Sequence, residues 1–142
     1  MRGDGRQLDY RPSAFDIVFS NSVAEHLGTW ADQQRFAAEI RRVGKAYWVQ
    51  TPNRWFPFDP HLLALFVHYL PKAIQQHLLR YGTIWGLVIR PTRAQVAGFL
   101  AEVRLLTERE MRALFPDAQI LVERFCGLNK SFIAVRQSNC EL

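Results

Sequence analysis

The pair Glu25-His26 is the sharpest chemical feature of the sequence. A histidine titrates near neutral pH, so His26 could accept a proton from a hydroxyl or amine substrate as a general base. Glu25 could orient the imidazole or balance its charge, although adjacent residues on a helix do not face each other. We therefore take His26 as the candidate catalytic residue. The alternative is that His26 is a half-buried polar residue that anchors a loop.

A metal site is not expected from the sequence. Clusters of acids and histidines can hold a divalent cation, but hard cations need several oxygen ligands and only one such pair is visible. The cysteines, Cys126 and Cys140, form neither a disulfide framework nor a Cys/His metal spacing. We expect both to be plain thiols.

The elements that must position His26 form one unit. Apolar runs at 15–19 and 46–49 flank a segment whose apolar residues Phe36, Ile40 and Val43 recur at helical spacing. Thr29 can cap the start of this helix and Gly44 its end. Two apolar runs around a helix predict a β-α-β crossover whose parallel strands are covered on both faces.

Polar residues follow each of the two predicted strands. Ser20-Asn21-Ser22 comes after the first strand and Thr51-Pro52-Asn53 after the second. Ligands of open parallel sheets lie beyond the carboxyl ends of the strands, so both segments are predicted at the ligand edge. Asn21 either contacts the ligand there or caps the next turn.

The same residues carry a resemblance to a known family. Gly3-Asp4-Gly5, the run from Phe15 to Ser22, and Glu25-His26-Leu27 resemble the middle of a class I S-adenosylmethionine-dependent methyltransferase. Segments 51–61 and 106–128 resemble a branch of that family that acts on small molecules.

The resemblance implies a cofactor and residues that bind it. In the family, the acid after the third strand contacts the adenine amine, and that position falls on Asp4. The resemblance thus implies S-adenosyl-L-methionine as cofactor, with Asp4, Gly5, Arg6 and Asn21 as its contacts. The sequence departs from the family in lacking the Gly-rich turn that holds the methionine end, since no G-x-G-x-x-G follows a strand. We expect that the real protein starts upstream; the alternative is that the second half survives as a separate product.

Residues 53–105 are expected to form a helical lid insertion, with helices at 61–70 and 72–81. Such a lid would hold an apolar acceptor and exclude water. Its candidate acceptor-site residues are Trp55, His61, His68 and Tyr69. Ordinary packing is one alternative, and peripheral contact with a membrane is another, because apolar helices adjoin basic residues here.

The C-terminal part of the sequence indicates a helix and two strands but offers no candidate catalytic or binding residue. Thr107 and Glu110 form a capping box, with Leu106 and Met111 placed as a hydrophobic staple, and the helix runs to about Phe115. Strands at 118–125 and 130–136 follow as an antiparallel hairpin.

Composition narrows the class of protein. A net charge of +5 and a pI near 9.7 suggest nucleic acid, but the basic residues are scattered and match no binding motif, so no nucleic-acid partner is expected. No apolar run of about 18 residues is present, and the N-terminus lacks the apolar core of a signal peptide. A cytoplasmic protein is the expectation.

Together these features predict the C-terminal portion of a Rossmann-like α/β methyltransferase fold. Residues 1–142 are taken as a partial methyltransferase domain with a four-stranded mixed sheet at 15–20, 46–51, 118–125 and 130–136. The predicted function is methyl transfer to an unidentified small-molecule or lipid-like acceptor. The alternative is a non-catalytic remnant or interaction module. The first strand would be an open apolar edge, which predicts self-association or poor solubility.

Overall fold

The structure is a computed structural model that describes residues 3–59, 64–65, 70–71, 74–75, 77–78 and 91–138. The chain divides into two compact units, each described by itself below. The first comprises Met1–Trp55 and Arg104–Leu142, and the second comprises Phe56–Val103.

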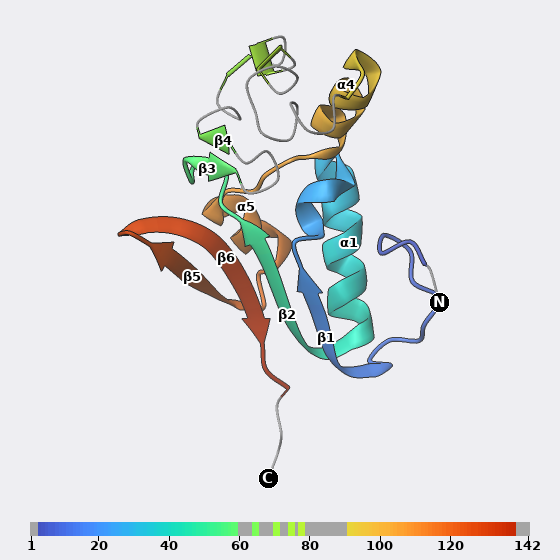
Figure 1. Ribbon diagram of the computed structural model, residues 1–142. Coiled ribbons are helices and arrows are strands. Elements are labelled where there is room, and N and C mark those ends of the chain that lie inside the picture. The colour runs from blue at the N-terminus through green and yellow to red at the C-terminus, as the bar shows by residue number, and fades with distance from the viewer. Residues whose placement is uncertain are drawn as a thin grey trace. The chain divides into compact units, whose positions relative to one another are not determined.

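The first unit is built on a four-stranded mixed sheet in the order β1-β2-β6-β5 (Figure 1). Strands β1 (Phe15–Asn21) and β2 (Gly44–Pro52) are parallel, whereas β6 (Leu128–Arg136) is antiparallel to both β2 and β5 (Gln119–Phe125). The predicted sheet, its parallel pair and its C-terminal hairpin are therefore confirmed, with strand ends shifted by one or two residues.

Helix α1 (Trp30–Val43) makes the crossover between the parallel strands. The hydroxyl of Thr29 caps it by accepting a hydrogen bond from the backbone N–H of Asp32 at 3.1 Å, as predicted. The helix passes into β2 without a connecting loop, so Gly44 is both its C-cap and the first strand residue. A Cβ at Gly44 would lie 2.8 Å from the carbonyl oxygen of Ala46 and 2.8 Å from a methyl of Val18. Only glycine fits this tight junction.

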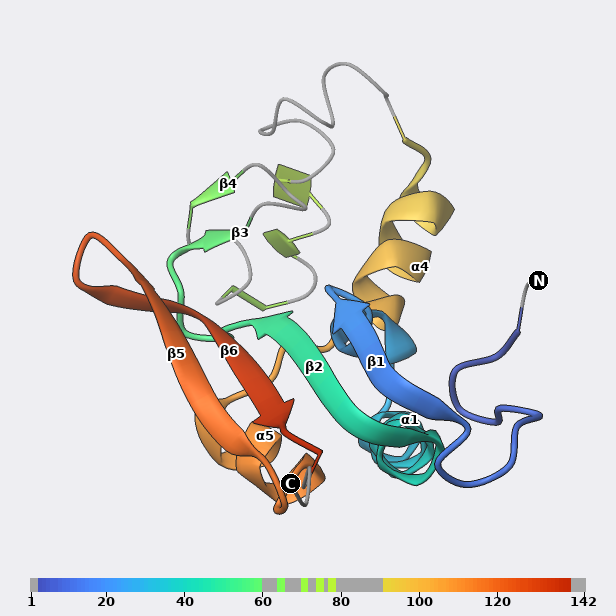
Figure 2. The same cartoon turned by 90° about the horizontal axis from the view of Figure 1, so that it is seen from below.

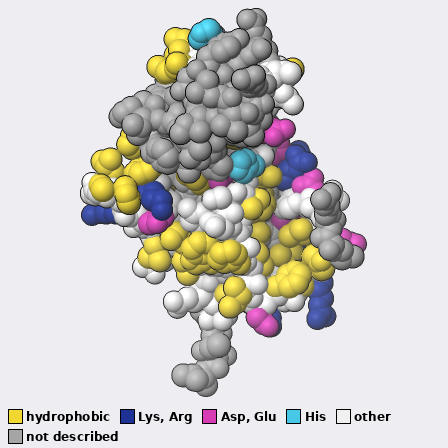
Figure 3. Space-filling model, viewed as in Figure 1, with side chains coloured by type: hydrophobic (Ala, Val, Ile, Leu, Met, Phe, Trp, Pro, Cys, Tyr) yellow, Lys and Arg dark blue, Asp and Glu magenta, His cyan; other side chains and the backbone are white. Residues whose placement is uncertain are grey.

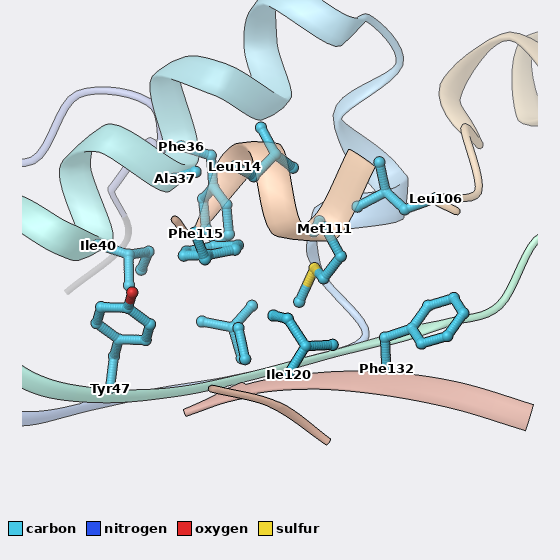
Figure 4. Packing of buried hydrophobic residues seen from close by; sticks show 13 residues of the cluster. Phe36, Ala37, Ile40, Tyr47, Leu106, Met111, Leu114, Phe115, Ile120 and Phe132 are labelled. Carbon is cyan, nitrogen blue, oxygen red and sulfur yellow. The ribbon is translucent and has the colours of Figure 1, made fainter. Parts of the chain in front are cut away.

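Helices α1 and α5 (Glu108–Leu114) cover one face of the sheet (Figure 2). Both hydrogen bonds of the capping box between Thr107 and Glu110 are present, so that prediction is confirmed. Figure 4 shows Tyr47 and Ile120 of the sheet facing Phe115 and other helical side chains across the core. The core cluster consists of residues 24, 36, 37, 40, 47, 49, 106, 111, 114, 115, 120, 132 and 134.

The opposite face of the sheet is apolar and exposed. Ile17 is 70% exposed and Phe19 68%, while Phe19 stacks on Trp48 with ring centroids 4.7 Å apart. Trp48 in turn pairs in register with Val135, and Figure 3 shows hydrophobic side chains gathered over these strands. The prediction that strand 15–20 is covered on both faces is therefore wrong for the described residues. An apolar strand pattern reports a tendency to be buried, but it does not say which segment provides the cover.

An ionic cluster joins the amino end of β2 to the start of the hairpin. The hydroxyl of Tyr47 donates to Asp117 at 2.8 Å, and the Arg136 guanidinium binds the same carboxylate at 2.7 Å. Burial alone would raise the pKa of Asp117, but the hydrogen bonds from Arg136 and Tyr47 outweigh it and lower that pKa. Burial and the hydrogen bond to Asp117 raise the pKa of Tyr47. The cluster is thus built for an ionised Asp117 and a neutral Tyr47.

The second unit contains a short antiparallel pair, β3 (Phe58–Asp59) with β4 (Ala64–Leu65), and helix α4 (Arg93–Glu102). The prediction of a helix over 61–70 is wrong at 64–65, because a short apolar run suits a strand as well as a helix. Of the helix predicted at 72–81, residues 74–75 and 77–78 are helical. The other positions of these two predicted helices, except for Leu70, lie outside the described residues.

We propose that the open apolar face mediates self-association, and charge placed on this face should then reduce it. Replacing Ile17 and Phe19 together by lysine removes the most exposed apolar side chains of the edge strand and adds repulsion. We expect the variant to sediment as a smaller species than the parent protein. Leu128→Lys, which places one charge on an exposed apolar residue of the hairpin, is the control. Equal sedimentation of the parent and the double variant would contradict self-association through this face.

Asp117→Asn should cost about 1–2 kcal/mol of unfolding free energy at neutral pH, because it removes the charge that three side chains bind, those of Tyr47, Arg136 and Arg41. Since the folded-state pKa is lowered, the contribution of Asp117 is complete above its ordinary pKa and disappears as pH falls through the lowered value. Urea denaturation between pH 7 and pH 2 should show a shallower acid loss for the variant. The control is Asp9→Asn, at an exposed carboxylate, which should lose unfolding free energy with falling pH as steeply as the parent protein. An equally steep loss in Asp117→Asn would count against the cluster.

Candidate functional site

The parallel strands end side by side and present polar groups there. Asn21 at the end of β1 pairs in register with Gln50 of β2. The N–H of Ser22 donates to the carbonyl of Gln50 at 3.1 Å, and its hydroxyl lies 3.2 Å from the Gln50 side-chain oxygen. Ser22 has a φ of 53°, a left-handed conformation that serine seldom adopts. The chain therefore turns sharply at the point where the sequence predicts a ligand edge.

Ser20 contributes a buried hydroxyl at the same end of β1. The residue is 7% exposed, and its Oγ has no hydrogen-bond partner among the described residues. Buried polar atoms in folded proteins nearly always have a partner. The hydroxyl is thus a free donor and acceptor within the described part of the chain.

The single-turn 3-10 helix η1 (Ala24–Leu27) holds the two residues singled out by their chemistry. Glu25 is fully buried, and its carboxylate accepts a hydrogen bond from the Thr51 hydroxyl at 3.1 Å. His26 is exposed, and its backbone N–H donates to the carbonyl of Val23 at 3.0 Å. The turn therefore anchors Glu25 to the end of β2 and leaves the imidazole of His26 at the surface.

A buried amide fixes this turn to helix α1 and to the segment before α5. Gln33 has no exposed surface, and its side-chain N–H group donates to the carbonyls of Ala24 and Arg104, both at 2.9 Å. The Arg104 guanidinium donates back to the Gln33 oxygen at 2.7 Å and also binds Glu110. Sequence patterns give no signal for this network, because Gln33 and Arg104 are 71 positions apart.

The carboxylate of Glu110 completes the network. Burial alone would raise the pKa of Glu110, but hydrogen bonds from the Thr107 backbone and from Arg104 outweigh it and lower that pKa. Glu110 is therefore ionised at neutral pH, where it pairs with the Arg104 guanidinium.

The N-terminal loop brings together three of the predicted cofactor contacts. Arg6 binds the carboxylate of Asp4 at 2.7 Å and that of Asp32, in the first turn of α1, at 3.2 Å. The hydrogen bonds from Arg6 lower the pKa of Asp4 to about 2, so this half-exposed carboxylate is ionised at neutral pH. Gly5 lies against Phe36, whose ring would be 3.1 Å from a Cβ at that position. The loop is thus attached to α1, whereas Asn21 belongs to β1 and His26 to η1.

The predicted acceptor-site residues are described only in part. Trp55, at the end of the first unit, is 62% exposed. His61, His68 and Tyr69 lie outside the described residues. Within the part of the chain that the structure describes, no group of three or more histidines, cysteines or acids could hold a metal ion. Over the same part, no helix has both the length and the apolar character to cross a membrane.

A family model matches the first part of the chain. Residues 1–46 match a family model described as a methyltransferase domain. This stretch includes Asp4, Gly5, Arg6, Asn21 and His26, and the match confirms the resemblance to methyltransferases that these residues suggested.

Two uncharacterized proteins of Mycobacterium tuberculosis, from strain CDC 1551 / Oshkosh and strain H37Rv, are each 28% identical to this chain over 109 residues. The match covers 70% of this chain and 37% of each relative. The chain therefore spans well under half the length of these curated relatives.

A solved structure shows a similar fold at low sequence identity. A crystal structure described as a possible exported protein from Bordetella parapertussis has a TM-score of 0.51 and 18% identity, over 96% of this chain and 43% of that one. A SAM-dependent methyltransferase from Methanosarcina mazei gives a TM-score of 0.49 and 13% identity, over 94% of this chain and 63% of that one. The four-stranded mixed sheet with its helices is the predicted α/β fold, and the Bordetella parapertussis structure shares it.

Replacing Gln33 by methionine tests the buried network. The substitution keeps the volume but leaves two carbonyls and the Arg104 guanidinium without their partner, at a cost of about 2–4 kcal/mol. Urea denaturation should show this loss, whereas Gln34→Met, at the exposed neighbouring position, should change stability by less than about 0.5 kcal/mol. Similar losses for both variants would contradict the network.

Proposed function

We propose that this protein takes part in methyl transfer from S-adenosylmethionine to a small-molecule or lipid-like acceptor. One observation carries the proposal: the parallel strands β1 and β2 end together in polar segments, and β1 with the turn after it lies within residues 1–46, which match a methyltransferase domain. Open parallel sheets bind their ligands at this edge. The chain spans only 37% of the length of its curated relatives. The proposed activity is therefore based on the site itself and not on those relatives.

Several described groups suit the adenosine part of the cofactor. The ionised carboxylate of Asp4 can accept a hydrogen bond from the adenine amine, and the backbone N–H of Gly5 is a donor in the same loop. Asn21 and the hydroxyl of Ser20, which has no hydrogen-bond partner among the described residues, supply further polar groups at the end of β1. The cofactor, when bound, supplies a methyl group on a cationic sulfur. For its methionine end the sequence offers no Gly-rich turn.

The protein's own part in this chemistry is placement and proton removal. Holding an acceptor atom in line with a methyl group replaces a bimolecular encounter by a positioned one. The exposed imidazole of His26 could take the acceptor's proton as a general base. The bond between Glu25 and Thr51 keeps the turn that bears His26 fixed to the end of β2.

A second candidate is an interaction module without catalysis. The exposed apolar face formed by Ile17, Phe19 and Trp48 favours it, because soluble proteins rarely leave such a surface uncovered. A partner strand could pair with the free edge of β1. Binding of a cofactor analogue separates the two candidates.

Calorimetric titration with S-adenosylhomocysteine tests the proposed function. We expect heat of binding for the parent protein, and affinity at least about tenfold weaker for Asp4→Ala and for Asn21→Ala, a loss of about 1.4 kcal/mol each. Asp9→Ala, at an exposed acid of the same loop, is the matched control. No heat with the parent protein would favour the interaction module, and equal losses for Asp4→Ala and Asp9→Ala would remove Asp4 from the site.

A further inference from the structure

A hollow of about 540 Å³ lies where three segments of the first unit meet. The chain after β2 contributes Trp55, the start of α5 contributes Arg109, and the start of β6 contributes Leu128. The buried ring of Phe132 also lines it. A volume of this size suits a small molecule.

Asn53 builds the hollow by joining two of these segments. Its side-chain N–H donates to the carbonyl of Asn129 at 2.7 Å, and its side-chain oxygen accepts from the N–H of Trp55 at 3.0 Å. Its backbone N–H donates to the carbonyl of Lys130 at 2.9 Å. Asn53 is 6% exposed, so these bonds hold the walls of the hollow in place.

The side chains around the hollow give it one uncompensated positive charge. Arg109 has no ion pair or hydrogen bond from its guanidinium within the described residues that surround it. The carboxylate of Glu108, which also lines the hollow, is engaged by Arg112 at 2.7 Å and 3.1 Å. An anionic group would therefore meet an available guanidinium, which binds carboxylates in a planar, two-pronged geometry.

Trp55 adds a flat apolar surface. Its side chain is 62% exposed, and the Arg54 guanidinium lies 5.7 Å from the centre of its ring. An indole favours contact with another planar ring. The nearby carboxylate of Glu108 would repel a doubly charged group more strongly than a singly charged one.

We propose that this hollow binds a planar aromatic carboxylate, with the guanidinium of Arg109 holding the carboxylate and the ring resting on Trp55. The assignment rests on the proposed function in one respect: the bound molecule is the methyl acceptor. The binding itself requires no methyl donor.

The test uses 4-hydroxybenzoate and its neutral analogue 4-hydroxybenzamide, titrated into the 142-residue protein without methyl donor and followed by two-dimensional NMR. We expect the acid to bind at least tenfold more tightly than the amide and to shift the indole N–H signal of Trp55, assigned with Trp55→Phe. Arg109→Gln should weaken the acid at least tenfold and leave the amide unchanged. Arg124→Gln, at an exposed arginine of β5 outside the hollow, should stay within twofold of the parent.

Equal binding of acid and amide, no binding of either, or equal losses in the two arginine variants would overturn the proposal. Circular dichroism of each variant shows whether it remains folded, and Arg109→Lys provides a second variant that keeps the charge but loses the two-pronged geometry. If S-adenosylhomocysteine does not bind, the proposed function is contradicted, but the proposed binding of the aromatic acid in this hollow is not. Failure of the acid alone would remove the site and leave donor binding intact.

Discussion

The parallel pairing of β1 with β2 is the constraint on which the candidate site depends. Six residue pairs from Phe15 with Gly44 to Asn21 with Gln50 fix the register, and the carboxyl ends of the strands consequently meet at one edge. The junction at Gly44 makes this possible, because α1 must turn directly into β2 with no room for a side chain. Without that pairing, Asn21 and Thr51 would have no reason to lie near each other.

Buried polar bonds then place the turn that follows β1. Burying a carboxylate such as that of Glu25 is costly unless it is hydrogen-bonded, and the hydroxyl of Thr51 supplies such a bond. Gln33 extends the connection to Arg104, where the chain re-enters the first unit. The edge of the sheet is therefore held by hydrogen bonds from three separate segments, which limits how far His26 can move.

The sequence was sufficient for most of the first unit because its signals are local. Helical spacing, the cap at Thr29 and the capping box at Thr107 each depend on residues within one turn, and the structure has all of them. The network around Gln33 was not predictable, because its partners are distant in the chain and glutamine is usually exposed. The exposure of Ile17 was not predicted, because an apolar side chain suggests burial but does not identify a segment that packs against it.

We propose that the ends of β1 and β2 form a cofactor-binding edge. Its most direct test is a backbone NMR titration with S-adenosylhomocysteine, in which each amide reports its own environment. We expect shifts concentrated at Gly5, Asn21 and Ser22, with the amides of β5 unchanged. Shifts confined to other parts of the chain, or none at saturating ligand, would contradict it.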